Sequence, residues 1–211
     1  MTLLQAVGGF AAIAALLTIA PGLDTALVLR STLAQGWARA FWAMLGIVAG
    51  LLIWGTFAAL GVTALLAASH VAYDIVRLCG AAYLLVLGAR MLVRALRRRA
   101  AAAVEPIRSA PPGRFRAWMT GLTTNLLNPK IGIFYLAALP QFLVPGVPPA
   151  AMGILLASVH AAITLAWLGL LAAGASAAAR WLQRPLFSRL VDGVTGAVLI
   201  GLGVRTALER A

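Results

Sequence analysis

The run AFWAMLGIVAGLLIWGTFAALGVTALLAA occupies residues 40–68 and contains no charged residue. A helix needs roughly 20 consecutive apolar residues to cross the ~30 Å hydrocarbon layer of a membrane, and this run is longer. Comparable uncharged runs occupy residues 3–20 and 150–179. Because these runs are long and uniform, whereas the strands of a membrane barrel are short and alternate in polarity, they predict transmembrane helices.

The overall composition is typical of a membrane protein. Of the 211 residues, 63% are hydrophobic and 10% are charged, whereas globular proteins have about 45–50% apolar and about 25% charged residues. The net charge of +12 does not indicate nucleic-acid binding, because the arginines lie near the ends of apolar runs and no basic groove lined with aromatic residues is visible. Cys79 is the only cysteine, and the two histidines lack the paired spacing of zinc ligands. We therefore expect no metal and no cofactor.

We predict an all-α membrane protein with six transmembrane helices. Their expected ranges are residues 3–29, 40–67, 71–93, 117–143, 150–179 and 190–207. Because proline removes a backbone donor and clashes with the preceding turn, the first helix should be broken at Pro21 and the fourth at Pro129. We interpret the first range as a retained helix and not as a cleavable signal peptide, since no basic segment precedes it and the apolar run continues beyond residue 20.

The chain also divides into two similar halves within one transporter domain, residues 1–211. Residues 1–93 and 117–211 each form a unit of three helices that begins with a proline-broken helix, and the basic segment 94–116 joins them. The units close with related text, LGAR at residues 87–90 and LGVR at residues 202–205. An odd number of spans in each unit predicts inverted repeats, an arrangement typical of transporters.

The distribution of arginine predicts the orientation. Arginines are concentrated in the loops after the first, third and fifth helices, whereas the loops after the second and fourth helices contain no lysine or arginine. Basic loops remain in the cytoplasm. Both termini are therefore expected outside the cytoplasm, and the protein in the inner (plasma) membrane of a bacterium.

The first candidate site is Pro21-Gly22-Leu23-Asp24-Thr25. A helix opened by Pro21 and Gly22 would expose backbone polar groups at membrane depth, and a carboxylate there is costly unless it faces a cavity or a partner. Asp24 is thus a candidate to bind a substrate ammonium or to carry a coupling proton. The alternative is that Asp24 caps the helix that begins at Thr25 and faces water near the interface.

The second candidate site is Asn125-Leu-Leu-Asn128-Pro129-Lys130. The two asparagines are three residues apart, which would place them on one face of a helix. Lys130 is the only lysine, and it could pair with the carboxylate of a substrate or of Asp24. A helix beginning at Pro129 would also present free N–H groups to an anion. The alternative is a simple kink whose lysine extends toward the lipid headgroups.

Three further residues are secondary candidates. Tyr83 could donate a hydrogen bond inside the bundle or only pack there. Gln141 could contribute to a gate or only mark a helix end. His160 lies in a helix and could take part in a proton relay if it faces Ser158 or Thr164 in a cavity. Separately, Gly46 and Gly50 form a G-x-x-x-G pattern that favours close helix packing.

Taken in order, these motifs resemble the LysE/RhtB family of amino-acid exporters. The matching segments are PGLD at residues 21–24, GAAYLLVLG at 80–88, NLLNPK at 125–130 and LPQF at 139–142. The resemblance covers essentially the whole chain and implies export of amino acids or close derivatives, driven by the proton gradient. Leu23 departs from the family pattern, which has a second proline at this place.

The function that we predict is a secondary active exporter of amino acids, working as a proton antiporter. Its expected partners are the amino acid, protons and membrane lipid, with no nucleic acid, and a homodimer is left open. An enzyme is not expected, because Ser158 and His160 are too close in sequence to share a helical face. The alternatives are a membrane structural or assembly factor, or a channel.

Overall fold

The computed structural model describes residues 1–96, 113–182 and 184–208. Within these ranges every regular element is a helix, as the composition predicted. The elements are α1 (Leu3–Ile19), α2 (Leu23–Gln35), α3 (Trp37–Ala68), α4 (His70–Leu96), α5 (Arg114–Leu126), α6 (Pro129–Ala138), the 3-10 helix η1 (Leu139–Phe142), α7 (Pro149–Ala173), α8 (Ala175–Leu182) and α9 (Pro185–Leu208). Most of the predicted basic linker, residues 97–112, and Arg210 lie outside the described residues.

The chain is a multi-pass membrane protein. Four helical segments in the described ranges are long and apolar enough to cross a membrane: Trp37–Gly61, Arg77–Leu96, Pro149–Ala173 and Arg189–Leu208. The helices α1 and α2 qualify as a fifth span if they are taken together, with a bend of 53° between them. The fourth predicted span is divided among α5, α6 and η1, which are shorter. The count of six spans therefore stays a prediction.

Helix ends occur close to both of the prolines considered above. The helix α1 ends at Ile19 and α2 begins at Leu23, so that Pro21 and Gly22 lie in the gap. Pro129 is the first residue of α6, where a missing N–H costs nothing and the fixed φ suits a helix start. A further interruption was not expected: α7 ends at Ala173, Gly174 follows it, and a separate helix α8 covers residues that we had assigned to the fifth span.

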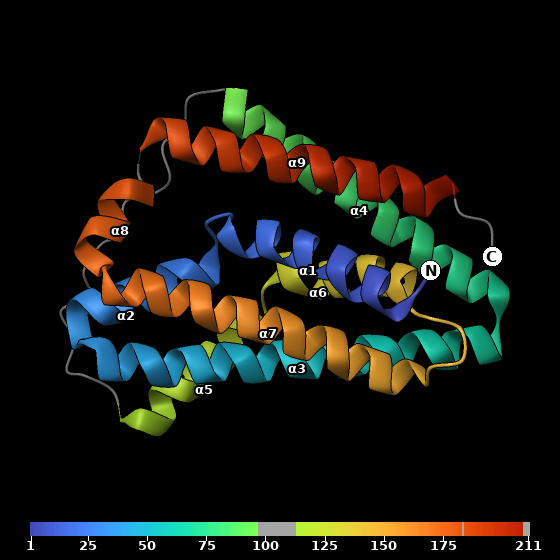
Figure 1. Cartoon of the computed structure of the whole chain (residues 1–211), viewed down its shortest axis with the longest axis horizontal. Coiled ribbons are helices and arrows are strands. Elements are labelled where there is room, and N and C mark those ends of the chain that lie inside the picture. The colour runs from blue at the N-terminus through green and yellow to red at the C-terminus, as the bar shows by residue number, and fades with distance from the viewer. Residues whose placement is uncertain (97–112, 183, 209–211) are drawn as a thin grey trace.

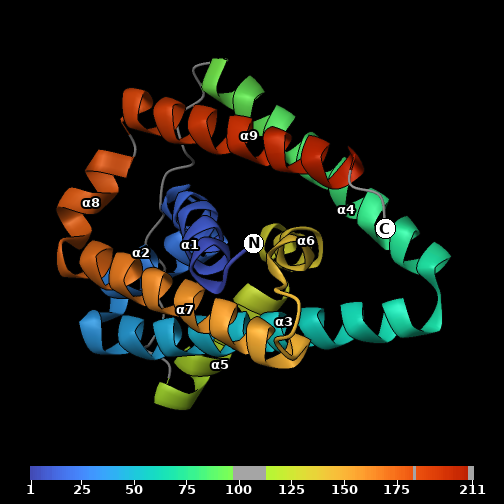
Figure 2. The same cartoon turned by 45° about the vertical axis from the view of Figure 1, so that its right-hand side comes forward.

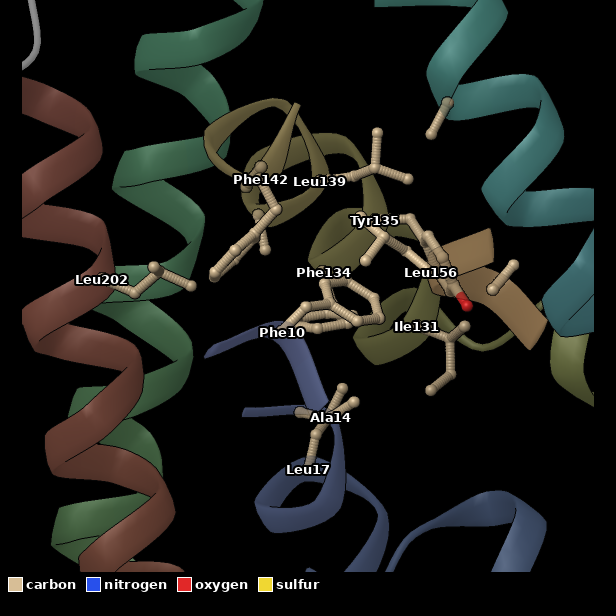
Figure 3. Close-up of a cluster of buried hydrophobic side chains, with 14 of the residues drawn as sticks. Phe10, Ala14, Leu17, Ile131, Phe134, Tyr135, Leu139, Phe142, Leu156 and Leu202 are labelled. Carbon is tan, nitrogen blue, oxygen red and sulfur yellow. The ribbon is translucent and has the colours of Figure 1, made fainter. Parts of the chain in front are cut away.

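The longer helices surround two short central helices, α1 and α6 (Figures 1 and 2). Figures 1 and 2 show α4 and α9 side by side along one side of the molecule, α3 and α7 on the opposite side, and α1 and α6 between them. Phe10 of α1 and Phe134 of α6 are fully buried, and their ring centroids are 5.6 Å apart. Figure 3 shows this contact within the buried aromatic cluster. The two short helices are thus packed directly against each other.

The G-x-x-x-G pattern of α3 lies against α5. A Cβ atom added at Gly46 would lie 2.0 Å from the carbonyl oxygen of Trp118, and one added at Gly50 would lie 2.6 Å from Oδ1 of Asn125. No side chain fits at such distances, so the predicted close packing is confirmed. This packing brings the end of α5 close to the gap between α1 and α2.

Candidate functional site

The carboxylate of Asp24 is bound by an asparagine from the other half of the chain. Asp24 lies in the first turn of α2, and its Oδ2 accepts a hydrogen bond of 2.9 Å from Nδ2 of Asn125, which is fully buried. The residue that caps α2 is Gly22, and no side chain caps this helix. The alternative in which Asp24 is a helix cap is therefore wrong.

The ammonium of Lys130 occupies the open end of α1. Its Nζ donates to the carbonyl oxygens of Leu17 at 2.6 Å and Ala20 at 2.9 Å. In a continuous helix the Leu17 carbonyl would accept from the N–H of the residue at position 21, but Pro21 has none. A cation is also favoured at a helix C-terminus by the helix dipole. Lys130 is thus held inside the protein, and the alternative in which it extends toward the headgroups is wrong.

Two carboxylates act on this ammonium. Lys130 interacts electrostatically with Asp24 and with Asp192 of α9, and Asp192 also interacts with Arg94 of α4. Among the described residues, Oδ1 of Asp24 is buried without a hydrogen-bond partner. A buried carboxylate oxygen without a donor is costly. The Asn128 side chain also acts on this carboxylate, but no hydrogen bond from the described part of the chain reaches Oδ1, so the site has an acceptor for one further donor.

The start of α6 differs from our expectation. The side-chain Oδ1 of Asn128 accepts a hydrogen bond of 3.1 Å from the backbone N–H of Lys130. The backbone carbonyl oxygen of Asn128 accepts from the N–H groups of Ile131 and Gly132. These N–H groups have partners and are not free for an anion. Asn125 and Asn128 also do not share a helical face, because α5 ends at Leu126 between them.

A small cavity collects the groups from both candidate sites. Its volume is about 30 Å³, and its lining includes Gly22, Asp24, Thr25, Asn128 and Lys130. The remaining predicted residues contribute indirectly: Asn125 holds Asp24, whereas Pro21 and Pro129 lie at the helix ends. This volume suits a water molecule. It is too small for an amino acid, so the central site is closed in this structure.

A chain of hydrogen-bonded side chains borders the same cavity. His160 lies in α7. Its Nδ1 is 3.1 Å from Oη of Tyr135, and its Nε2 is 3.1 Å from Oγ1 of Thr18. Thr18 Oγ1 is in turn 3.4 Å from Thr164 Oγ1. If Tyr135 donates to Nδ1, then Nε2–H donates to Thr18, and both ring nitrogens are satisfied. His160 thereby links α7 to α1 and α6.

The other two secondary candidates lie elsewhere. Gln141 in η1 donates to the carbonyl oxygen of Ala137 at 3.1 Å and to the hydroxyl of Thr206 in α9. Tyr83 is half-buried on α4. Neither residue lines the cavity around Lys130.

The profile of the LysE type translocator family matches residues 15–210. The chain belongs to this family. The resemblance inferred from the motifs is thus confirmed, and the protein is of a transporter class and not an enzyme.

Several curated proteins are similar to this LysE type translocator over most of their length. The uncharacterized membrane protein YrhP of Bacillus subtilis (strain 168) is 30% identical over 205 residues, covering 93% of this chain and 96% of that protein. A threonine efflux protein of Salmonella typhi is 31% identical, with 91% and 92% covered. A leucine efflux protein of Klebsiella pneumoniae is 30% identical, with 92% and 91% covered. No solved structure matches the chain.

Three residues around the site of this LysE type translocator escaped the sequence reasoning. They are Thr18, Tyr135 and Asp192. Asp192 carried a usable signal, because it is one of only five acidic residues and lies within an expected span, where a carboxylate is costly. Nothing in the sequence distinguished Thr18 and Tyr135 from the other threonines and tyrosines.

Proposed function

We propose that this LysE type translocator is a secondary active exporter of amino acids or close derivatives. The proposal is supported by its relatives, which include proteins named for efflux of threonine, leucine and homoserine. It is also supported by the chemistry of the cavity. A carboxylate and an ammonium face one small space there, and an amino acid carries both charges.

The observation on which the proposal rests is the pairing of the two helix gaps. The first gap supplies Asp24 and the carbonyl oxygens of Leu17 and Ala20, all of which are acceptors for an ammonium. The second gap supplies Lys130, whose own ammonium is bound to those carbonyl oxygens. Lys130 therefore occupies the place where a substrate ammonium would find acceptors.

Transport then proceeds by exchange of cations at this place. The substrate ammonium replaces that of Lys130 at the end of α1 and beside Oδ1 of Asp24. Lys130, once released, pairs with the substrate carboxylate. Because the cavity of about 30 Å³ cannot hold an amino acid, the helices must separate for loading and close again, which is the requirement of alternating access.

Asp24 is the carboxylate that couples transport to protons. An ionised Asp24 holds the substrate ammonium, whereas a protonated Asp24 does not attract it. Proton entry from outside the cell would therefore favour substrate release there, and proton loss to the cytoplasm would restore the loading state. Protons and lipid are the other partners, and this mechanism does not require a second copy of the chain.

The architecture proposed for this cycle is a single domain of six spans in two inverted repeats, residues 1–93 and 117–211. Support comes from the crossing of α4 and α9, which would be the third helices of the two repeats. A Cβ atom at Gly88 would lie 2.6 Å from the Gly196 carbonyl oxygen, and one at Gly196 would lie 2.7 Å from that of Gly88. If LGAR 87–90 and LGVR 202–205 are equivalent segments, Gly88 corresponds to Gly203 and Gly196 to Ala81. A two-fold axis relating the repeats then predicts a second close approach of α4 and α9, and a Cβ atom at Gly203 would lie 3.0 Å from the Ala81 carbonyl oxygen.

The membrane orientation follows from the arginines in residues 30–39, 94–116 and 180–189, which surround the connections from α2 to α3, α4 to α5 and α8 to α9. With these three connections in the cytoplasm of a bacterium, both termini lie outside it. The broken helices would then present their gaps within the inner membrane.

Radiolabelled amino acids and inverted vesicles test the proposal. Export corresponds to uptake into such vesicles, and the proposal predicts saturable uptake of at least one amino acid, stimulated when the vesicle lumen is acidic. Preloaded vesicles should also show counterflow, which a channel cannot produce. Absence of uptake for every amino acid tested, with the protein present and folded, would refute the exporter.

A further inference from the structure

A second and larger cavity lies on the opposite side of α2. Its volume is about 400 Å³, and it lies between α2, α3 and α5. Its polar lining comprises Arg30, Ser31, Gln35, Thr120 and Thr124. Figure 1 shows these three helices meeting at one end of the molecule. We propose that this cavity is a second binding site for the amino-acid substrate, in which Arg30 binds the carboxylate; this rests on the proposed export function. We call it the outer cavity because it lies farther from the centre of the helix bundle than the cavity around Lys130, and not because it faces the outside of the cell.

The two cavities differ in what they can hold. Sites for small ligands commonly have volumes of about 300–1,000 Å³, and the outer cavity of about 400 Å³ falls in this range. The central cavity of about 30 Å³ does not. In the state described by this structure, an amino acid therefore fits beside Arg30 and does not fit beside Asp24.

Arg30 is available for a ligand. No hydrogen bond or ion pair involves its side chain in the described part of the chain, and its Nε is buried without a partner. A guanidinium binds a carboxylate through two parallel hydrogen bonds, and this geometry is a stronger arrangement than a single neutral bond. The hydroxyls of Ser31 and Thr124 lie on the same lining and can accept or donate to the rest of the substrate.

The helix α2 forms the wall between the two cavities. Leu23, Leu27 and Arg30 are spaced along the face that lines the outer cavity, whereas Asp24 and Thr25 line the central one. A substrate held by Arg30 is thus separated from Asp24 only by this short helix. Since α2 is joined to α1 by a gap with a 53° bend, movement of α2 at that gap would connect the cavities.

The location fits loading from the cytoplasm. The outer cavity includes Gln35 at the end of α2 and Ala117 near the start of α5. These two ends adjoin the segments that carry Arg39 and Arg114. In the proposed orientation this is the cytoplasmic side, from which an exporter receives its substrate.

Transport kinetics in inverted vesicles test the outer site, with L-leucine and L-threonine as substrates and L-leucinamide as a probe without a carboxylate. For Arg30→Gln we expect the KM for the amino acids to rise on the order of 10-fold, since a hydrogen bond to a charged group is lost, while the maximal rate changes less than about twofold. Arg30→Lys should lie between Arg30→Gln and the wild type. Competition by leucinamide should be the same in all three proteins.

Arg114→Gln is the matched control. Arg114 is an exposed arginine at the same end of the molecule, and it does not line the cavity. Its KM should equal that of the wild type. The outer site is refuted if the wild type transports and Arg30→Gln has an unchanged KM, or a KM equal to that of Arg114→Gln. It is also refuted if the effect appears only in vesicles with phosphatidylglycerol and not in phosphatidylcholine alone, because Arg30 would then bind a lipid phosphate. Lack of transport by the wild type would instead refute the exporter and this site with it.

Discussion

Lys130 Nζ donates a hydrogen bond of 2.6 Å to the carbonyl oxygen of Leu17. Leu17 is four residues before Pro21, so this carbonyl has lost the helical donor that any other residue at position 21 would supply. The only lysine of the chain replaces it. Pro21 leaves the Leu17 carbonyl oxygen without a helical donor, and Lys130, the residue after Pro129, supplies one. The two helix gaps therefore form one structural unit.

Replacing Lys130 tests this unit. In Lys130→Met the carbonyl oxygens of Leu17 and Ala20 lose their donor, and each unmade bond costs about 1–3 kcal/mol. We expect a lower melting temperature in detergent and a loss of transport of at least about tenfold. Lys130→Arg keeps the charge but has a planar head group, and it should retain part of the stability and less of the transport.

The packing of α3 against α5 gives a second prediction. A Cβ atom at Gly50 would lie 2.6 Å from Oδ1 of Asn125, so Gly50→Ala must displace the side chain that binds Asp24. We expect reduced transport and a loss of stability of about 1–3 kcal/mol. Gly61→Ala is the control in the same helix, because nothing lies within 4 Å of its added Cβ. Equal effects of the two substitutions on transport would contradict the role given to the Asn125 contact.

The hydrogen-bonded chain through His160 gives a third prediction. Tyr135→Phe removes the partner of Nδ1 and leaves it unpaired among apolar side chains. Because hydrogen bonds between membrane helices contribute about 0.6–2 kcal/mol, the melting temperature should fall measurably. Tyr83→Phe is the control, since Tyr83 makes no hydrogen bond in the described part of the chain. If both variants melt at the same temperature, the hydrogen bonds through His160 do not contribute to stability.

Much of the fold was predictable because its signals are local. The apolar runs predicted helices, and glycine spacing in α3 predicted a close approach. Helix ends lie close to Pro21 and Pro129, where the chemistry of proline favours them. The interruption after Ala173 was missed because a single glycine within an apolar run is common in membrane helices and does not by itself predict an end.

The contacts within the candidate site were predictable only in part. The opposite charges of Asp24 and Lys130 suggested that their segments face one another. In the structure Lys130 binds carbonyl oxygens of α1, and Asn125 rather than Lys130 donates to Asp24. Both contacts depend on the relative placement of four helices. Short sequence patterns do not contain that information. Asp192 differs from these cases, because its position in an expected span was visible in the sequence.

In the proposed mechanism, Asp24 couples amino-acid export to protons. The most direct test is uptake of radiolabelled substrate into inverted vesicles containing Asp24→Asn, measured with and without an acidic lumen. Asp74→Asn is the control, because Asp74 forms a local ion pair with Arg77 in α4. We predict that the pH gradient stimulates uptake by the wild type and by Asp74→Asn and has no effect on residual uptake by Asp24→Asn. Stimulation of Asp24→Asn to the wild-type rate would contradict the coupling role of Asp24.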